Sequence, residues 1–448
     1  MKSNSGAVGG KPHFLNAFFS SGFMAVLCFA AIPAAIAFCI INRGIAGTAA
    51  LTAAVMITAI QAGIVIFRNS RSGWEIRGDY LRLFSPEGER KLMLRGITCA
   101  QIRGLRFLRI SGCVRVKIYC EGMREAWISM VMKKACAEEL IERLMNCFVP
   151  EDVLPAGSFR QGRHSAAAHA LTAERPLMLL LGSLLLTVFS HGSLAEDILA
   201  SALLIWAVAE MAADAAKGCR LSPEMLPGGY RIRYGLFSDR TVFIPYRSAV
   251  GVSVKCSPAA AFCGAWSMEL ICGGGRRVPC VMWAVGGEQE KNALRLLGIS
   301  GDNGRFYSDP ERLRRKYFRE FLFCMSVSVT AAVAAVSYAG DAGGVFLAGA
   351  IFSLCVFGAR CWLGLRVAGR SGAGISPSAL RAGGISRCRA EQTYLRRSGV
   401  EGIRISSPIW GRMDDLCSIM PVAGGKGLGL WCRYVPYSAV RGITARFL

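Results

Sequence analysis

Six long apolar stretches, arranged as three close pairs, constrain this chain more than any other feature. Each is long enough to cross the hydrocarbon core of a membrane, which takes about 17–25 helical residues. The stretches cover residues 20–41, 45–67, 176–193, 194–215, 318–338 and 343–365. The short links within the pairs read "NRG", "SHGSL" and "AGDAG", which is typical of tight bends. The sequence therefore predicts three transmembrane hairpins.

The distribution of basic residues predicts the orientation of these hairpins. The chain has 53 Lys and Arg against 30 Asp and Glu, and only Arg43 lies in a hairpin link. By the positive-inside rule, the long segments and both termini lie in the cytoplasm of a multi-pass protein of the cytoplasmic membrane. A cleavable signal peptide is the alternative at the N-terminus, with Lys2 and Lys11 before the apolar run. We favour a hairpin because a second apolar stretch follows at once.

The cysteines and histidines give no pattern of metal ligands. The chain has 18 Cys and 4 His, without a single CxxC pair. A zinc site needs closely spaced Cys or His ligands, and a cytoplasmic location disfavours disulfides. We therefore expect no metal, no cofactor and no disulfide framework.

The long segments between the hairpins predict an internal repeat. They begin near Arg68, Lys217 and Val367, about 150 residues apart. An apolar residue occupies the equivalent place in each segment: Leu94, Ile244 and Leu395. The dipeptide Ser-Pro recurs at 257–258 and 407–408. The predicted unit is therefore two spanning helices followed by about a hundred cytoplasmic residues.

Each cytoplasmic segment has the pattern of a β domain that ends in a helix. Residues 114–120 and 230–237 alternate between apolar and polar, which is typical of half-buried strands. The turns "SPEGER" and "CGGGRR" favour hairpins. Closing helices are predicted at 133–147, 288–297 and 437–448. The alternative for the last is that residues 435–443 begin a truncated further repeat.

These motifs resemble a known family. Transmembrane hairpins followed by a basic β segment with "I-P-x-x-x-(V/I)-x-x-V" and a later "S-P" are similar to bacterial PH-like, membrane-flanked domain proteins, in particular the long multi-unit YdbT-like type. The resemblance implies a strongly bent, seven-stranded sheet with a C-terminal helix, a cytoplasmic-membrane location and no enzymatic motif. It also implies that a shorter single-unit relative is a possible protein partner.

The expected fold is thus an α+β membrane protein with six transmembrane helices in three hairpins, each followed by a cytoplasmic PH-like β domain with a C-terminal helix. The expected boundaries are 1–67 for the tail and first hairpin, 68–172 for the first β domain, 173–216 for the second hairpin, 217–316 for the second β domain, 317–366 for the third hairpin and 367–448 for the short third β domain.

Clusters of basic residues flank the predicted helices and are the first candidate sites. They comprise Arg68, Arg71, Arg312, Arg314, Arg315, Lys316, Arg366 and Arg370. Charges at helix ends fix orientation and attract anionic headgroups, at about 1 kcal/mol each. The alternative to this general role is that the basic residues form a specific site for an anionic lipid headgroup. We do not expect nucleic acid as a partner, because aromatic residues are not interleaved with the charges.

Polar residues inside the predicted helices are the second set of candidates, because lipid disfavours them. Gln61, Glu210 and Asp214 either lie at the interface or line a transport pathway. No nucleophile elbow, Walker A loop or zincin motif occurs. We therefore expect a non-enzymatic scaffold or membrane-surface binding protein. A lipid-handling or transport component of the cell envelope is the alternative, and a membrane enzyme is less favoured.

Overall fold

The computed structural model describes most of the chain. The described residues are 8–13, 71–85, 88–104, 112–121, 126–146, 163–189, 194–236, 239–285, 305–338, 343–376, 379–386, 388–407, 416–423, 426–427, 432–447 and scattered positions between 36 and 67. The first predicted hairpin and the helix predicted at 288–297 therefore lie largely or wholly outside them.

The chain divides into two compact units. The N-terminal unit contains Met1–Ala156, Met225–Arg231 and Phe237–Tyr246, and the C-terminal unit contains Gly157–Glu224, Ile232–Leu236 and Arg247–Leu448. The division cuts across the order of the sequence, because a short segment near residue 240 belongs with the N-terminal unit.

Two sheets form the N-terminal unit. The first has the order β1-β2-β3-β4, with β1 at Val8–Gly10, β2 at Gly73–Arg77, β3 at Tyr80–Ser85 and β4 at Gly88–Met93. The second has the order β7-β6-β5-β10-β9-β8, and joins β5 (Ile97–Gly104), β6 (Cys113–Cys120) and β7 (Ile128–Lys133) to β8 (Ser222–Leu226), β9 (Gly229–Tyr234) and β10 (Asp239–Pro245). Strand β10 is antiparallel to β5.

Alternating residues build the core of this unit. In β6, Val114, Val116 and Ile118 are buried while the residues between them are only partly buried, as a period of two requires. Helix α6 (Lys134–Asn146) buries one face against the same core, with Ala137, Leu140, Ile141 and Leu144. The spacing of these four residues is that of an amphipathic helix. The helix predicted at 133–147 lies where expected.

A seven-stranded sheet and a smaller four-stranded sheet form the β part of the C-terminal unit. The larger has the order β13-β12-β11-β17-β16-β15-β14, with β11 at Ala249–Cys256, β12 at Ala265–Cys272, β13 at Arg276–Val285, β14 at Arg305–Tyr307, β15 at Gly372–Ile375, β16 at Ala379–Ser386 and β17 at Arg389–Arg396. The smaller contains β18 (Gly402–Ser406), β19 (Leu416–Ala423), β20 (Lys426–Gly427) and β21 (Cys432–Pro436), with β19 pairing the other three.

Helix α15 (Tyr437–Phe447) closes the chain and packs in the core of the smaller sheet. Its Ala439, Val440 and Ile443 join residues of β15, β16, β19 and β21 in one buried cluster. This is the helix expected at 437–448, not the start of a further strand repeat. The sequence "VPY" of the alternative interpretation forms the end of β21 and the start of this helix.

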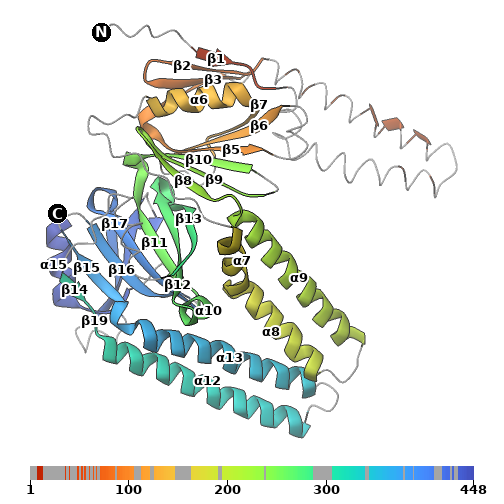
Figure 1. Cartoon of the computed structure of the whole chain (residues 1–448), viewed down its shortest axis with the longest axis vertical. Helices are drawn as coiled ribbons and strands as arrows, with labels where there is room; N and C mark the ends of the chain where they lie inside the picture. Colours follow the sequence, from red (N-terminus) through yellow and green to blue (C-terminus); the bar gives the residue numbers. More distant parts are fainter. Residues whose placement is uncertain are drawn as a thin grey trace. The chain divides into compact units, whose positions relative to one another are not determined.

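Long apolar helices occupy the other part of the C-terminal unit (Figure 1). They are α8 (Glu174–Phe189), α9 (Leu194–Gly218), α12 (Pro310–Tyr338) and α13 (Gly343–Val367), with α7 (Arg163–Thr172) leading into α8. Among the described residues, three helices are long and apolar enough to cross a membrane. A fourth span results if α7 and α8, bent by 53° at their junction, count as one.

These helices pack through small residues. Helix α12 lies along α13, α8 lies along α9, and α13 also contacts α8. Gly364 of α13 lies so close to Tyr317 of α12 that an added Cβ would be 2.4 Å from that ring. Small residues of this kind allow helices to approach closely inside a membrane.

Two details differ from the sequence-based expectations. Helix α12 begins at Pro310 instead of 318, because Asp309 accepts a hydrogen bond from the backbone N–H of Arg312 (3.1 Å) and a proline follows it. This is a typical helix start. In addition, 3-10 turns begin at Leu94, Tyr246 and Arg397. Ile244 and Leu395 lie two residues before their turns, so Leu94 is not their positional equivalent, although all three residues are buried.

Candidate binding pocket at the end of α13

A pocket of about 300 Å³ lies inside the C-terminal unit, where α13 ends next to the larger sheet. Its volume is at the small end of the range for ligand sites. The lining residues come from the end of α13 and the turn after it, from the short helix Pro258–Phe262 and the turn that follows, and from β11, β12, β16 and β17: Val254, Cys256, Ala261, Gly264, Ala265, Trp266, Arg366, Val367, Arg370, Ser371, Gly384, Ala390, Glu391 and Gln392.

The end of α13 brings two arginines to one wall of the pocket. Arg366 lies in the last turn of the helix and Arg370 in the 3-10 turn Ala368–Arg370 (η6) that follows. The Ser371 hydroxyl donates to the carbonyl oxygen of Val367 at 3.1 Å and so holds this end of the helix. Both arginine side chains are exposed. The Arg366 guanidinium also lies 5.3 Å from the centre of the Trp362 ring.

A short helix forms the opposite wall. Helix α10 (Pro258–Phe262) is capped by Ser257, whose hydroxyl accepts from the backbone N–H of Ala260 at 3.1 Å. The same hydroxyl donates to the carbonyl oxygen of Thr172 at 2.6 Å, which attaches α10 to α7. Phe262, at the end of α10, is 80% exposed. An aromatic ring so exposed next to apolar helices fits a membrane interface.

The carboxylate of the pocket, Glu391 of β17, already has partners. It accepts a hydrogen bond from the Ser253 hydroxyl at 2.7 Å and forms an ion pair with Arg277. Among the described residues, in contrast, no carboxylate forms an ion pair with Arg366 or Arg370. The uncompensated charge that faces the pocket is therefore positive.

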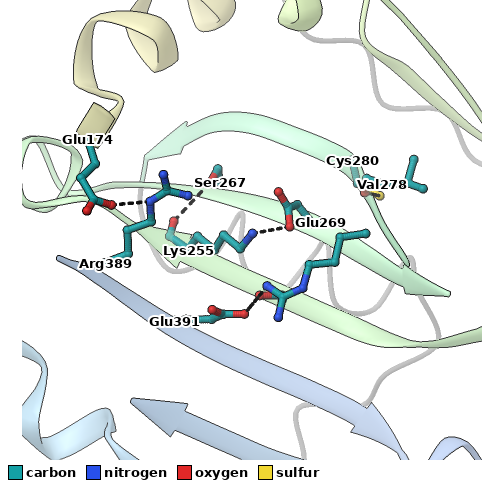
Figure 2. Close-up of polar contacts among 10 residues, drawn as sticks. Glu174, Lys255, Ser267, Glu269, Val278, Cys280, Arg389 and Glu391 are labelled. Atoms are coloured by element: carbon teal, nitrogen blue, oxygen red, sulfur yellow. Dashed lines mark hydrogen bonds and ion pairs between the residues drawn. The ribbon is translucent and has the colours of Figure 1, made fainter. Parts of the chain in front are cut away.

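Further ion pairs join the strands and helices around the pocket (Figure 2). Arg389 of β17 contacts Glu174 at the start of α8, with 2.6 Å between Nε and Oε2. Lys255 of β11 pairs with Glu269 of β12 across the same sheet. The sheet that carries Glu391 is thus tied to the helices by charged groups that are partly shielded from water.

The basic candidates on α12 do not line this pocket. On α12, Arg312 pairs with Asp309 (3.2 Å), Arg315 with Glu311 (3.6 Å) and Lys316 with Glu320 (3.3 Å), while Arg314 is exposed. The Arg71 guanidinium lies 4.4 Å from the centre of the Phe67 ring. Arg68 lies outside the described residues. Of the basic candidates in the part of the chain that the structure describes, Arg366 and Arg370 line the pocket.

The polar candidates of the predicted helices have local partners. Glu210 accepts from the Trp206 indole at 3.4 Å, and Asp214 contacts Lys217 at 2.7 Å. Neither residue lines the pocket. Gln61 lies outside the described residues. Neither described residue therefore supports a transport pathway.

Sequence reasoning missed the residues that complete the pocket. Trp266 and Glu391 come from segments about a hundred residues before and twenty residues after Arg370, and no motif links them. A weak signal exists in "RAEQTYL", where Glu391 occupies a strand position that is 9% exposed. Buried charges of this kind need partners, so this carboxylate predicts a polar network without revealing its members.

Buried cysteines near the pocket have weakly acidic thiols. Burial raises the pKa of Cys280 on β13 to about 12, and also that of Cys432 on β21 to about 12. Among the described residues, no three His, Cys, Asp or Glu side chains are grouped so that they could hold a metal ion. Comparison of the chain with protein-family models, with curated proteins and with solved structures gives no match.

Proposed function

We propose that this protein is a non-enzymatic scaffold of the cytoplasmic membrane, built from three units of a transmembrane hairpin and a PH-like β domain. In this proposal six helices span the membrane, both termini are cytoplasmic, and the pocket at the end of α13 binds an anionic lipid headgroup. The β domains then form a surface on the inner leaflet on which lipids or protein partners assemble.

The strand order supports the repeat. In each proposed unit three strands lead to a 3-10 turn and then to three or four more strands: β2 to β7, β8 to β13, and β15 to β21. The first and third units also share a further strand, β1 beside β2 and β14 beside β15, and a helix after the last strand, α6 and α15. Such an arrangement fits the bent sheet and closing helix expected of PH-like domains.

The register between units supports the repeat independently. Strand β10 pairs with β5, and Phe243 lies opposite Ala100; strand β17 pairs with β11, and Tyr394 lies opposite Val252. Aligning the three 3-10 turns puts Ala100 at the place of Val252, and Phe243 at the place of Tyr394. The same antiparallel pairing between strands of successive units therefore occurs twice with the same register. We call each such pairing a joint.

One observation carries the lipid part of the proposal. Arg366 and Arg370 face a pocket directly at the end of an apolar helix, and among the described residues no carboxylate pairs with either. A position at the end of a spanning helix brings both charges to the level of the headgroups. The exposed Phe262 follows Ala261, which lines the pocket, and gives the same surface an apolar anchor.

The test compares two double variants of the full chain in phosphatidylcholine nanodiscs that contain a small amount of spin-labelled phosphatidylglycerol. Two lost contacts of about 1 kcal/mol each predict that Arg366→Gln with Arg370→Gln weakens the preference for the anionic lipid about 30-fold. The control, Arg314→Gln with Arg315→Gln, removes the same charge from α12 outside the pocket and should retain most of the preference. Equal losses in both variants, or no preference in the wild type, would overturn the pocket assignment.

A further inference from the structure

Two strands, β4 in the N-terminal unit and β18 in the C-terminal unit, each have one edge without a partner among the described strands. Strand β4 is the last strand of its sheet, and its only partner is β3; strand β18 pairs only with β19. Among the described strands, neither has a neighbour on its other side. We propose that the free edge of β18 in one copy of the chain pairs antiparallel with the free edge of β4 in a second copy, head to tail. This inference depends on the repeat proposed above, but not on lipid binding.

The joints within the chain show which kind of strand could pair with the free edges of β4 and β18. Strands β4, β10 and β17 each precede a 3-10 turn, and strands β5, β11 and β18 each follow one. Two joints are made in the chain, β10 with β5 and β17 with β11. The remaining members of the two sets are β4 and β18. One chain therefore carries both strands of a third joint, and β18 of one copy can pair with β4 of a second copy.

The register of the third joint follows from the first two. Aligned on the 3-10 turns, Ile403 takes the place of Val252, and Lys91 takes that of Tyr394, so these two residues would lie opposite each other. Continuing along the strands puts Ile405 opposite Glu89. Residues directly opposite in an antiparallel pair have Cα atoms about 4.5–5.5 Å apart, which is within the range that a disulfide bridges.

A glycine supports a close approach to β18. At the equivalent position of β11, Gly251 lies so near to β17 that an added Cβ would be 2.2 Å from the carbonyl oxygen of Tyr394. Strand β18 has Gly402 at that place, where an added Cβ would meet nothing within 4 Å. Glycine weakens a strand, and often marks the approach of another backbone. Gly402 has that function only if a further strand adds to β18.

The charges on β4 make the joint weak and selective. Glu89, Arg90 and Lys91 are exposed on this edge, which protects an edge strand from indiscriminate pairing. The proposed register places Arg90 opposite Arg404. Two arginines also lie opposite each other within the chain, Arg103 and Arg240, so such a pair is compatible with this joint. Repulsion between Arg90 and Arg404 predicts that added salt strengthens the association.

The test uses two differently tagged full-length copies expressed in one membrane, one with Glu89→Cys and the other with Ile405→Cys. Mild oxidation should give a disulfide between the copies, identified as linked peptides by mass spectrometry. The control replaces Ile405→Cys by Arg404→Cys, one residue away on the opposite face of the strand, and should give at least ten-fold less product. Equal yields in both registers, or no linked peptide from either, would refute the joint.

Two further variants separate the joint from folding and from lipid binding. Arg90→Glu places opposite charges across the joint and should raise the yield of linked peptide several-fold, whereas Gly402→Ala should lower it without unfolding the chain. If neither change affects the yield, the proposed register is wrong. If the chain prefers the anionic lipid but gives no linked peptide, only the joint is refuted. If the linked peptide forms but the chain shows no preference for the anionic lipid, only the headgroup pocket is refuted.

Discussion

Replacing Gly251 with alanine tests the joint between β11 and β17 directly. The added Cβ would lie 2.2 Å from the Tyr394 carbonyl oxygen and 2.9 Å from the Cα of Leu395. Ordinary contacts of a methyl group begin at 3.4 Å or more, so β17 would have to move by about 1 Å. Both obstacles are backbone atoms, which cannot rotate away as the end of a side chain can.

The expected cost follows from two opposing terms. Overpacking of this kind costs about 1–3 kcal/mol. Alanine also restricts the unfolded chain and so returns about 0.5–1 kcal/mol. The C-terminal unit should therefore lose about 1–2 kcal/mol, which corresponds to a fall in the unfolding temperature of about 2–8 °C for a unit of this size.

Gly402→Ala is the matched control, because its Cβ would meet nothing within 4 Å. In dilute detergent, where copies are separate, it should leave the unfolding temperature unchanged or slightly higher. Tryptophan fluorescence during heating reports on the unit, since Trp266 of β12 is buried beside the joint. Gly251→Ala at wild-type stability, or the same fall in both variants, would contradict the packing argument.

Two other predictions concern the surroundings of the pocket. At pH 8 a maleimide should modify the exposed Cys263 but not Cys280, because a thiol pKa of about 12 leaves about one molecule in ten thousand as thiolate. The rate of Cys280 labelling, measured by mass spectrometry, should rise about ten-fold per pH unit up to that pKa. Equal labelling rates of the two cysteines at pH 8 would contradict the burial of Cys280. Ser257→Ala removes the helix cap and the bond to Thr172 and should lower the free energy of unfolding by about 1–2 kcal/mol; Ser257→Thr, which keeps a hydroxyl, should lose less in urea titrations.

Local patterns in the sequence predicted the elements that local forces determine. Hydropathy located α9 and α13 to within a few residues, and alternation located β6. The start of α12 was readable too, because Asp309-Pro310 is a helix cap followed by a proline. Hydropathy alone missed it, since the first two turns of this helix are charged.

The partners of strands and pocket residues could not be predicted in the same way. Ser253 donates to Glu391 across 138 positions of sequence, and no local pattern specifies which strand lies next to β11. The two arginines of the pocket were found because they end an apolar helix. The position of Trp266 at the pocket could not be predicted, since its neighbours there are set by the long-range register of the sheet.

The pairing of β10 with β5 has a practical consequence for dividing the chain. A fragment cut at residue 216, the boundary that hydropathy suggests, ends before β10 and exposes the edge of β5 to solvent. A fragment that continues through Pro245 retains β8, β9 and β10 and so completes that sheet. An N-terminal fragment that keeps the second sheet whole must therefore extend about thirty residues beyond the boundary that hydropathy suggests, because strands β8, β9 and β10 complete a sheet that begins with β5, β6 and β7.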